Sequence, residues 1–215
     1  MPPGVTLAYP FTGRWLTQNS PANRVPSHGT NRYATAYAID FVPVGENGRT
    51  AAITLGSLFR SEPATRFPGF GRPVLAPVDG VVVAVDSSAP DHAAFRGFPS
   101  IGYALTQGRR AAEGWLALTG NHVMIQTESG PVVVLCHLRQ GRVQVDLGQP
   151  VKVGQVVGEC GNSGNSTEPH LHVQAITNPD VERAEAVPIT FHGRLPRNRE
   201  IIDVPHRHRG EAARG

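Results

Sequence analysis

Short apolar runs broken by glycine and proline dominate the second half of this sequence. β-branched and other apolar residues are concentrated in HVMIQT, GPVVVLCHL, QPVKVGQVVGEC and HLHVQAI, with turn residues between them. The chain holds 24 glycines and 19 prolines in 215 residues, so few stretches keep a helical period. The pattern predicts an all-β protein, mainly of antiparallel sheets, with few short helices. A Ser-Gly turn predicts that the first two of these runs form a hairpin.

The first half of the sequence is less regular. Alternation predicts a strand over residues 37–44, YAIDFVPV, and a strand, turn and second strand over residues 74–86, VLAPVDGVVVAVD. Residues 45–72 are expected to form a long excursion with at most a short helix around Ile53–Phe59. A second long insertion is expected over residues 87–117. Because no repeat or linker is visible, one domain is the simplest organisation.

The two ends of the chain differ in composition from its middle. Residues 1–27 are predicted to be an irregular segment that packs on the core, and residues 28–192 to be the main domain. Residues 193–215 are Arg-rich and are predicted to form a flexible tail. The first residues, MPPGVTLAYPF, lack the charged and apolar regions of a signal peptide, which predicts a cytoplasmic protein if the chain is complete.

Charge and cysteine content exclude several classes of protein. The formal net charge of +3 favours anionic partners such as wall polymers, but the basic residues are scattered and do not alternate with aromatics, so nucleic acid is not expected as a partner. No apolar run approaches the ~20 residues of a membrane span. Cys136 and Cys160 are too few for a disulfide framework, and could form one bridge or remain buried thiols.

The stretch EPHLHVQ contains two histidines one residue apart. On a strand, residues i and i+2 face the same side, so His170 and His172 share one face while Leu171 and Val173 share the apolar one. The histidine face could bind a metal, relay protons or meet solvent. A Gly-, Asn- and Ser-rich loop precedes the strand and would allow the backbone to approach a ligand closely.

Spacing alone does not establish a site, because His206 and His208 repeat it in PHRHRG, where arginines surround them. That pair is interpreted as exposed surface. Further candidates are Asp40, a carboxylate within an apolar strand, and His137 in VLCHL, which alternation places on the face opposite Cys136. His28 lies in a predicted turn, PSHGTN.

In combination, these segments resemble the lysostaphin-like (LytM-type) zinc metallopeptidases, which cut peptidoglycan cross-links. The resemblance runs in order through YAIDF, GRPVLAPVDGVV, GNHVMIQT, VLCHL, VKVGQVVGECGNSGNS and PHLHVQ. It implies duplicated hybrid-barrel-like sheets that form a groove, and one Zn²⁺ per chain. It also implies a zinc metalloendopeptidase of the cell envelope or the extracellular space, acting on a peptide or peptidoglycan substrate through a zinc-bound water.

The resemblance also implies roles for individual residues. Asp40 and His172 correspond to metal ligands, and His137 and His170 to catalytic residues; Asn162 and Asn165 are expected at the substrate. The family takes its other ligand from a histidine four residues before the aspartate, where this chain has Ala36. His28, the only upstream histidine, is therefore predicted to replace it.

A second departure from the family is Glu168, which stands where a small residue is usual.

Two other classes of protein fit part of the pattern. A non-catalytic relative that binds peptidoglycan or regulates another hydrolase would explain Ala36. A phosphocarrier or a lipoyl/biotinyl-type module would explain the Gly-punctuated strands. A carrier module, however, needs a lysine at its hairpin tip, where this sequence has Val-Asp-Gly. Nothing in the sequence indicates the oligomeric state or the bond that is cut.

Overall fold

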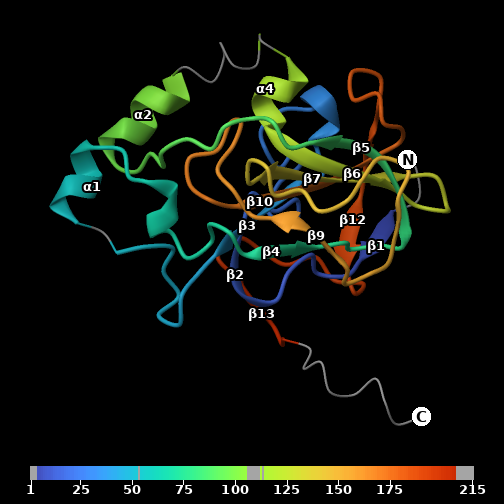
Figure 1. Ribbon diagram of the computed structural model, residues 1–215, viewed down its shortest axis with the longest axis horizontal. Helices are drawn as coiled ribbons and strands as arrows, with labels where there is room; N and C mark the ends of the chain where they lie inside the picture. The colour runs from blue at the N-terminus through green and yellow to red at the C-terminus, as the bar shows by residue number, and fades with distance from the viewer. Residues whose placement is uncertain (1–3, 53, 106–111, 113, 207–215) are drawn as a thin grey trace.

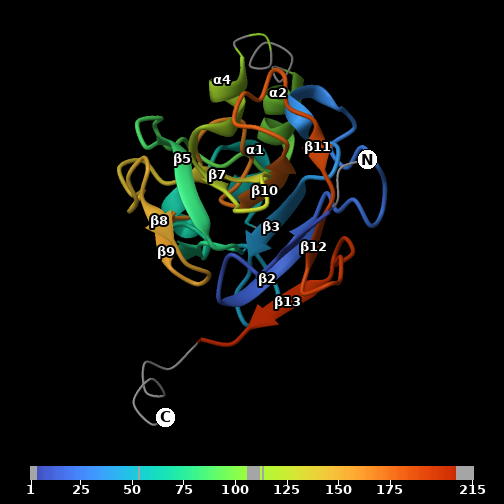
Figure 2. The same cartoon turned by 90° about the vertical axis from the view of Figure 1, so that its right-hand side faces the viewer.

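The computed structural model describes residues 4–52, 54–105, 112 and 114–206. An antiparallel sheet of nine strands dominates it (Figures 1 and 2). From one edge to the other, the strands of the sheet are β13 (Ile201–Val204), β2 (Gly13–Gln18), β3 (Ile39–Pro43), β10 (Leu171–Ile176), β7 (Val132–Leu138), β6 (Asn121–Gln126), β5 (Gly80–Asp86) and β8 (Pro150–Val151). The short strand β11 (Ala186–Val187) pairs with the far end of β10. The structure therefore confirms the predicted all-β class.

Two small sheets pack against one face of the main sheet. β1 (Val5–Leu7) pairs in parallel with β12 (Ile189–Phe191), and β4 (Pro73–Leu75) pairs antiparallel with β9 (Val156–Glu159). A large apolar cluster fills the space between, and it includes Phe41, Leu171 and Phe191. The rings of Phe41 and Phe191 meet edge to face, with centroids 5.2 Å apart. This packing fixes the position of β3 and β10, the strands that carry Asp40 and His172.

Alternation along β10 separates core residues from polar ones, as the sequence predicted. Leu171 and Val173 are fully buried in the large apolar cluster. His172 and Gln174 lie on the opposite face of the sheet, where they are also buried, at 8% and 0% exposure. A strand buried on both faces needs partners for every polar group, which sets up the site described below.

Strand pairing differs from the sequence prediction in the middle of the chain. The hairpin of β6 and β7 is confirmed. The strand, turn and second strand predicted over residues 74–86 are confirmed, but the two strands do not form a hairpin, because β4 pairs with β9 whereas β5 pairs with β6 and β8. In the same way, β8 and β9 pair with different partners rather than with each other. The short turns between β4 and β5 and between β8 and β9 therefore connect strands of different sheets and do not form hairpins.

The chain ends are more ordered than predicted over the described residues. β2, from the segment predicted to be irregular, is an inner strand of the main sheet. β13, from the predicted flexible tail, pairs antiparallel with β2 and places Ile202 in the core, at 8% exposure. Backbone pairing and one apolar anchor order this segment, although its four residues are too few to give a clear periodic signal. Residues 207–215, including His208, lie outside the described part of the chain.

The helices of the described residues are all short. η1 (Arg32–Ala34) lies in the loop before β3. The two insertions and the residues that follow the second one contain α1 (Leu55–Phe59), η2 (Ala64–Arg66), α2 (Phe98–Leu105) and α4 (Trp115–Thr119). α1 confirms the predicted short helix, although Ile53 itself is outside the described residues. α1 and α2 lie together on one side of the molecule, away from β1 and β12 (Figure 1). Within the described residues, no helix is long and apolar enough to cross a bilayer.

Candidate metal centre

A row of side chains crosses the polar face of the main sheet. Asp40 on β3 is the direct cross-strand partner of His172 on β10, and His172 is in turn opposite Cys136 on β7. Directly paired residues point to the same face, so the carboxylate and the imidazole meet. His172 Nδ1 lies 2.9 Å from Asp40 Oδ1. Sheet register thus joins residues 132 positions apart in the chain.

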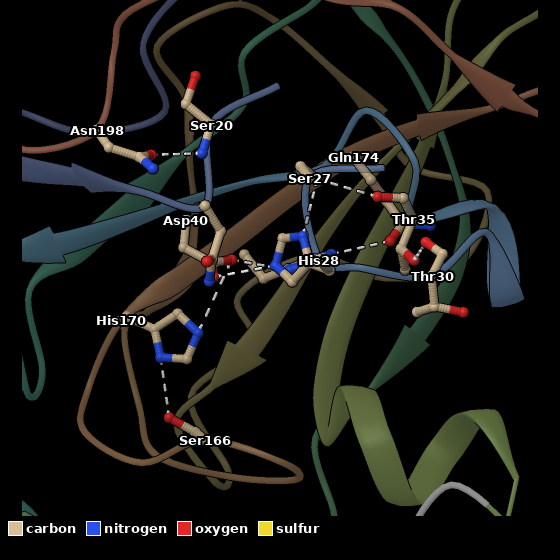
Figure 3. A network of polar contacts seen from close by, with 12 residues as sticks. Ser20, Ser27, His28, Thr30, Thr35, Asp40, Ser166, His170, Gln174 and Asn198 are labelled. Atoms are coloured by element: carbon tan, nitrogen blue, oxygen red, sulfur yellow. Dashed lines mark hydrogen bonds and ion pairs between the residues drawn. The ribbon is translucent and has the colours of Figure 1, made fainter. Parts of the chain in front are cut away.

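His28 reaches the same point from a loop. Ser27 donates its backbone N–H to Ala36 O at 2.9 Å and its hydroxyl to Thr35 O, which folds the loop back beside β3. His28 Nε2 then lies 3.0 Å from Asp40 Oδ2 (Figure 3). One potential ligand atom from each of His28, Asp40 and His172 lies within 4.8 Å of the others. The structure brings His28 into the cluster, twelve residues before Asp40.

Hydrogen bonds fix the tautomer of each of these histidines. The Ser27 hydroxyl donates to a carbonyl, so it accepts from His28 Nδ1–H. His172 Nε2–H donates to Gln174 Oε1 at 2.8 Å, and Gln174 Nε2 donates to Tyr33 O at 3.0 Å. His28 Nε2 and His172 Nδ1 are therefore the nitrogens that would bind a metal. In this structure both lie within hydrogen-bond distance of Asp40 and donate to its carboxylate.

The cluster has the chemistry of a zinc site with an open position. Two neutral imidazole nitrogens and one carboxylate are a ligand set found in catalytic zinc sites. Burial raises the pKa of Asp40, but the adjacent His28 and His172 outweigh this effect and hold that pKa well below its ordinary value. The carboxylate is therefore ionised at neutral pH. Asn19 Nδ2 donates to Asp40 Oδ2 at 2.7 Å and orients it further.

His137 enters the cluster through a β-bulge. Its φ is 63°, in the left-handed region, and the register of β6 with β7 shifts between Asn121 and His122. The alternation prediction for His137 is therefore wrong, since the extra residue turns its side chain to the face of Cys136. Both of these residues line the cleft, whereas Leu138 packs into the large apolar cluster. Bulges re-aim side chains in this way beside functional sites.

His137 and His170 face each other beside Asp40. Their ring centroids are 4.6 Å apart, and His170 Nε2 lies 4.0 Å from Asp40 Oδ1. His137 Nδ1–H donates to Ser163 O, and His170 Nδ1–H donates to Glu168 O, both at 2.9 Å. Each ring therefore leaves Nε2 unprotonated. Burial, together with the neighbouring His170 and His172, holds the pKa of His137 well below its ordinary value.

A cleft of about 540 Å³ opens over these four histidines. Residues of the 19–36 loop form one wall, including Arg24 and Arg32. The 165–168 segment forms another, through Asn165, Thr167 and Glu168, and Figure 3 shows Ser166 of this segment in contact with His170. Trp115 of α4 adds an aromatic side chain to the rim. The arrangement is a groove with a polar, histidine-lined floor.

The two asparagines expected at the substrate occupy different environments. Asn162 is fully buried: its Nδ2 donates to His92 O, and its Oδ1 accepts from the Ser166 hydroxyl. The prediction that it contacts substrate is wrong, because its amide is used inside the loop. Ser166 in turn lies 2.9 Å from His170 Nδ1, so Asn162 supports the loop beneath that histidine. Asn165 lines the cleft, and its contact with substrate stays a prediction.

Gln174, Asn19 and Ser27 complete the site, and no role was assigned to them from the sequence. Alternation placed Gln174 on the histidine face, which was the available signal. Asn19 directly follows β2, where Gln18 pairs with Asp40, but that pairing could not be read from the sequence. His206 is exposed and contacts Thr12 Oγ1, away from the cleft, in agreement with its interpretation as surface.

The two cysteines are free and buried. Burial raises the pKa of the Cys136 thiol and of the Cys160 thiol. The structure therefore favours the second of the two alternatives, buried thiols rather than a bridge.

Comparison with known proteins identifies one matching family model, described as Peptidase family M23, which aligns with residues 66–183. This span includes His137, His170 and His172, whereas His28 and Asp40 precede it. Glycyl-glycine endopeptidase ALE-1 of Staphylococcus capitis is 31% identical over 88 residues, which cover 41% of this chain and 24% of that protein. Lysostaphin of Staphylococcus simulans is 30% identical over 88 residues, covering 41% of this chain and 18% of lysostaphin.

Solved structures give distant similarities. The catalytic domain of lysostaphin from Staphylococcus simulans aligns with a TM-score of 0.40 and 20% identity, covering 70% of this chain and 74% of that one. The M23 metalloprotease pseudoalterin aligns with a TM-score of 0.45 and 14% identity, covering 86% and 75%.

Proposed function

The chain belongs to peptidase family M23, and on that premise we propose that it is a zinc metalloendopeptidase that hydrolyses peptide bonds in peptidoglycan cross-links. One observation carries the proposal: the ligand atoms of His28, Asp40 and His172 converge within 4.8 Å on the floor of a cleft, with two further imidazoles beside them. A site built only for structure would not need the additional unprotonated nitrogens of His137 and His170.

In this proposal His28 Nε2, an Asp40 carboxylate oxygen and His172 Nδ1 hold the metal. The hydrogen bonds at the outer nitrogens of the two histidines and the charge of Asp40 already suit metal ligands, so a metal would replace only the protons that the inner nitrogens donate to Asp40. Zinc held by these three residues would supply Lewis-acid polarisation of the scissile carbonyl and lower the pKa of water toward ~7.

His137 and His170 would accept and donate protons during the reaction. Each presents Nε2 as an acceptor, because its Nδ1–H is bonded to a backbone carbonyl. The lowered pKa of His137 keeps it neutral, which suits a group that takes a proton from the attacking water. Once protonated, either ring can donate to the oxyanion of the tetrahedral intermediate or to the leaving amine. Their 4.6 Å ring separation allows both to contact one reacting group.

The choice of substrate rests on the relatives. The protein of Staphylococcus capitis that shares 31% identity over 88 residues is named a glycyl-glycine endopeptidase. The cleft of about 540 Å³ has histidines and Asp40 among its lining residues, which could contact the polar groups of a peptide bond. A net charge of +3 also favours association with an anionic wall polymer.

The test is cleavage of defined substrates by zinc-loaded protein. We expect wild-type protein to release products from a panel of muropeptides and oligoglycines, and His137→Ala to reduce kcat/KM by at least about 100-fold, as loss of a general acid or base does. The matched control is His206→Ala, which removes an exposed histidine far from the cleft and should leave the rate unchanged. If the zinc-loaded protein binds muropeptides but cleaves none of the panel, it is a binding member of the family.

A further inference from the structure

The wall of the cleft beside His170 carries an acidic residue, Glu168. It directly precedes Pro169 and His170, and its backbone carbonyl accepts from His170 Nδ1–H at 2.9 Å. The backbone of Glu168 is therefore fixed by the site itself. Its side chain is partly buried and lines the cleft together with Thr167 and His170.

The carboxylate of Glu168 has no compensating partner within the described part of the chain. Its Oε2 is buried and accepts no hydrogen bond there, and no ion pair involves either oxygen. Leaving a buried carboxylate oxygen without a donor is costly, because a charged group loses its hydration and gains nothing in exchange. Because Glu168 also lines the cleft, a small rotation of its carboxylate toward the cleft would let a ligand supply the missing donor.

The nearby cations are already held elsewhere. Arg24, on the opposite wall, donates Nε–H to Ser27 O at 3.0 Å, and the Arg32 guanidinium stacks 4.7 Å above the Tyr33 ring. Arg96, from the insertion that packs on this wall, is bonded through Nε and Nη2 to Glu62 Oε2. Each arginine thus has a partner within its own surroundings.

We propose that Glu168 forms an ammonium subsite of the cleft, which binds a primary amino group of the peptide substrate. The inference rests on the proposed peptidase function and specifies its substrate: a peptide with a free α-amino group or a diamino-acid side chain next to the scissile bond. An ammonium group offers three donors on a compact cation, which matches one partly buried carboxylate better than a neutral amide does. Glu168 would act as a specificity-determining residue and take no part in the bond-breaking step.

Paired peptides test this subsite on the zinc-loaded full chain. One pair is hexaglycine amide with a free or an acetylated α-amino group, and the other is an acetylated oligoglycine containing lysine or acetyl-lysine. For wild-type protein we expect kcat/KM to be about 10- to 100-fold higher for the amine member of at least one pair. The pair that shows the effect identifies the amine as terminal or side-chain.

Two variants separate charge from structure. Glu168→Gln keeps the size of the side chain and should abolish the preference for the amine, mainly by slowing cleavage of the amine peptide. Glu182→Gln, at an exposed glutamate outside the cleft, should retain the full preference. Equal kcat/KM for both members of each pair in wild-type protein, or an undiminished preference in Glu168→Gln, would overturn the subsite.

The same pairs also distinguish failure of the subsite from failure of the peptidase function. Backbone N-methylated versions of the peptides resist cleavage, and their Kd values can be measured by calorimetry on zinc-loaded protein. A tighter Kd for the amine member that depends on Glu168 supports the subsite even if no peptide is cut. Normal cleavage with no amine preference in kcat/KM or in Kd rejects the subsite and leaves the peptidase function standing.

Discussion

Gln174 offers a quantitative test of how the fold prepares the metal site. Its side chain is fully buried between His172 and the 28–36 loop, with Oε1 accepting from His172 Nε2–H at 2.8 Å and Nε2 donating to Tyr33 O at 3.0 Å. Gln174→Met keeps the approximate volume and removes both hydrogen bonds. His172 Nε2–H would then have no acceptor, and the proton could move to Nδ1, the atom that faces Asp40.

Two magnitudes follow from these contacts. His172 Nε2–H left without an acceptor costs about 1–3 kcal/mol, and loss of the hydrogen bond to Tyr33 O costs about 0.5–1.5 kcal/mol, so the free energy of unfolding should fall by about 1.5–4.5 kcal/mol. Loss of an outer hydrogen bond to a metal-binding histidine typically lowers metal affinity 10- to 100-fold, or about 1.4–2.7 kcal/mol. The control is Gln126→Met, at an exposed glutamine at the end of strand β6, which should change neither quantity by more than about 0.5 kcal/mol.

The assays are chelator competition for zinc affinity and urea unfolding of the metal-free protein. Nitrogen-15 chemical shifts of the imidazoles report the His172 tautomer directly. If Gln174→Met is folded, binds zinc as tightly as wild-type protein and keeps its proton on Nε2, then Gln174 does not set the tautomer and the reasoning fails.

Two further predictions concern the two cysteines and the ion pair of Arg96 with Glu62. Burial raises the pKa of both the Cys136 and Cys160 thiols, so neither should react with a thiol reagent in the native protein at pH 8. Unreduced protein in denaturant should give two equivalents of reactive thiol per chain. A value near zero in denaturant would indicate a disulfide. Arg96→Ala should lower the free energy of unfolding by about 3–5 kcal/mol, because the carboxylate of Glu62, which is only 4% exposed, then loses its main partner. Adding Glu62→Leu in a double variant should restore part of that loss. Urea unfolding of the single and double variants checks this, and an Arg96→Ala variant as stable as wild-type protein contradicts it.

Much of the site could be predicted because its chemistry is local in the sequence. Period-two alternation separates His172 from Leu171 and assigns His170 and Gln174 to the same polar side of the chain. The structure also brings His28 to Asp40, as expected from the lack of any other upstream histidine. Alternation does not predict which residue each of these polar side chains contacts. The contact of Gln174 with Tyr33 depends on how the 28–36 loop folds over β10.

Other features depend on register and long-range pairing. One extra residue in β7 reverses the face of His137, and a bulge of this kind leaves no signature in an apolar run such as VVVLCHL. The partners of β4, β5, β8 and β9 are set by the packing of two sheets, whereas turn residues show only where the chain changes direction. The substrate contact predicted for Asn162 has a related difficulty. An asparagine in a loop can contact a ligand or form hydrogen bonds within the loop, and the sequence does not distinguish the two.

Zinc stoichiometry in matched histidine variants tests the central proposal most directly. Elemental analysis after dialysis should give one zinc per chain for wild-type protein and for His206→Ala, whose imidazole is exposed and remote from the cleft. His28→Ala should retain much less than one equivalent, since it removes one of the three ligand atoms within 4.8 Å. One zinc per chain in all three proteins, with unchanged affinity, would contradict the role of His28 and the metal centre proposed around Asp40 and His172.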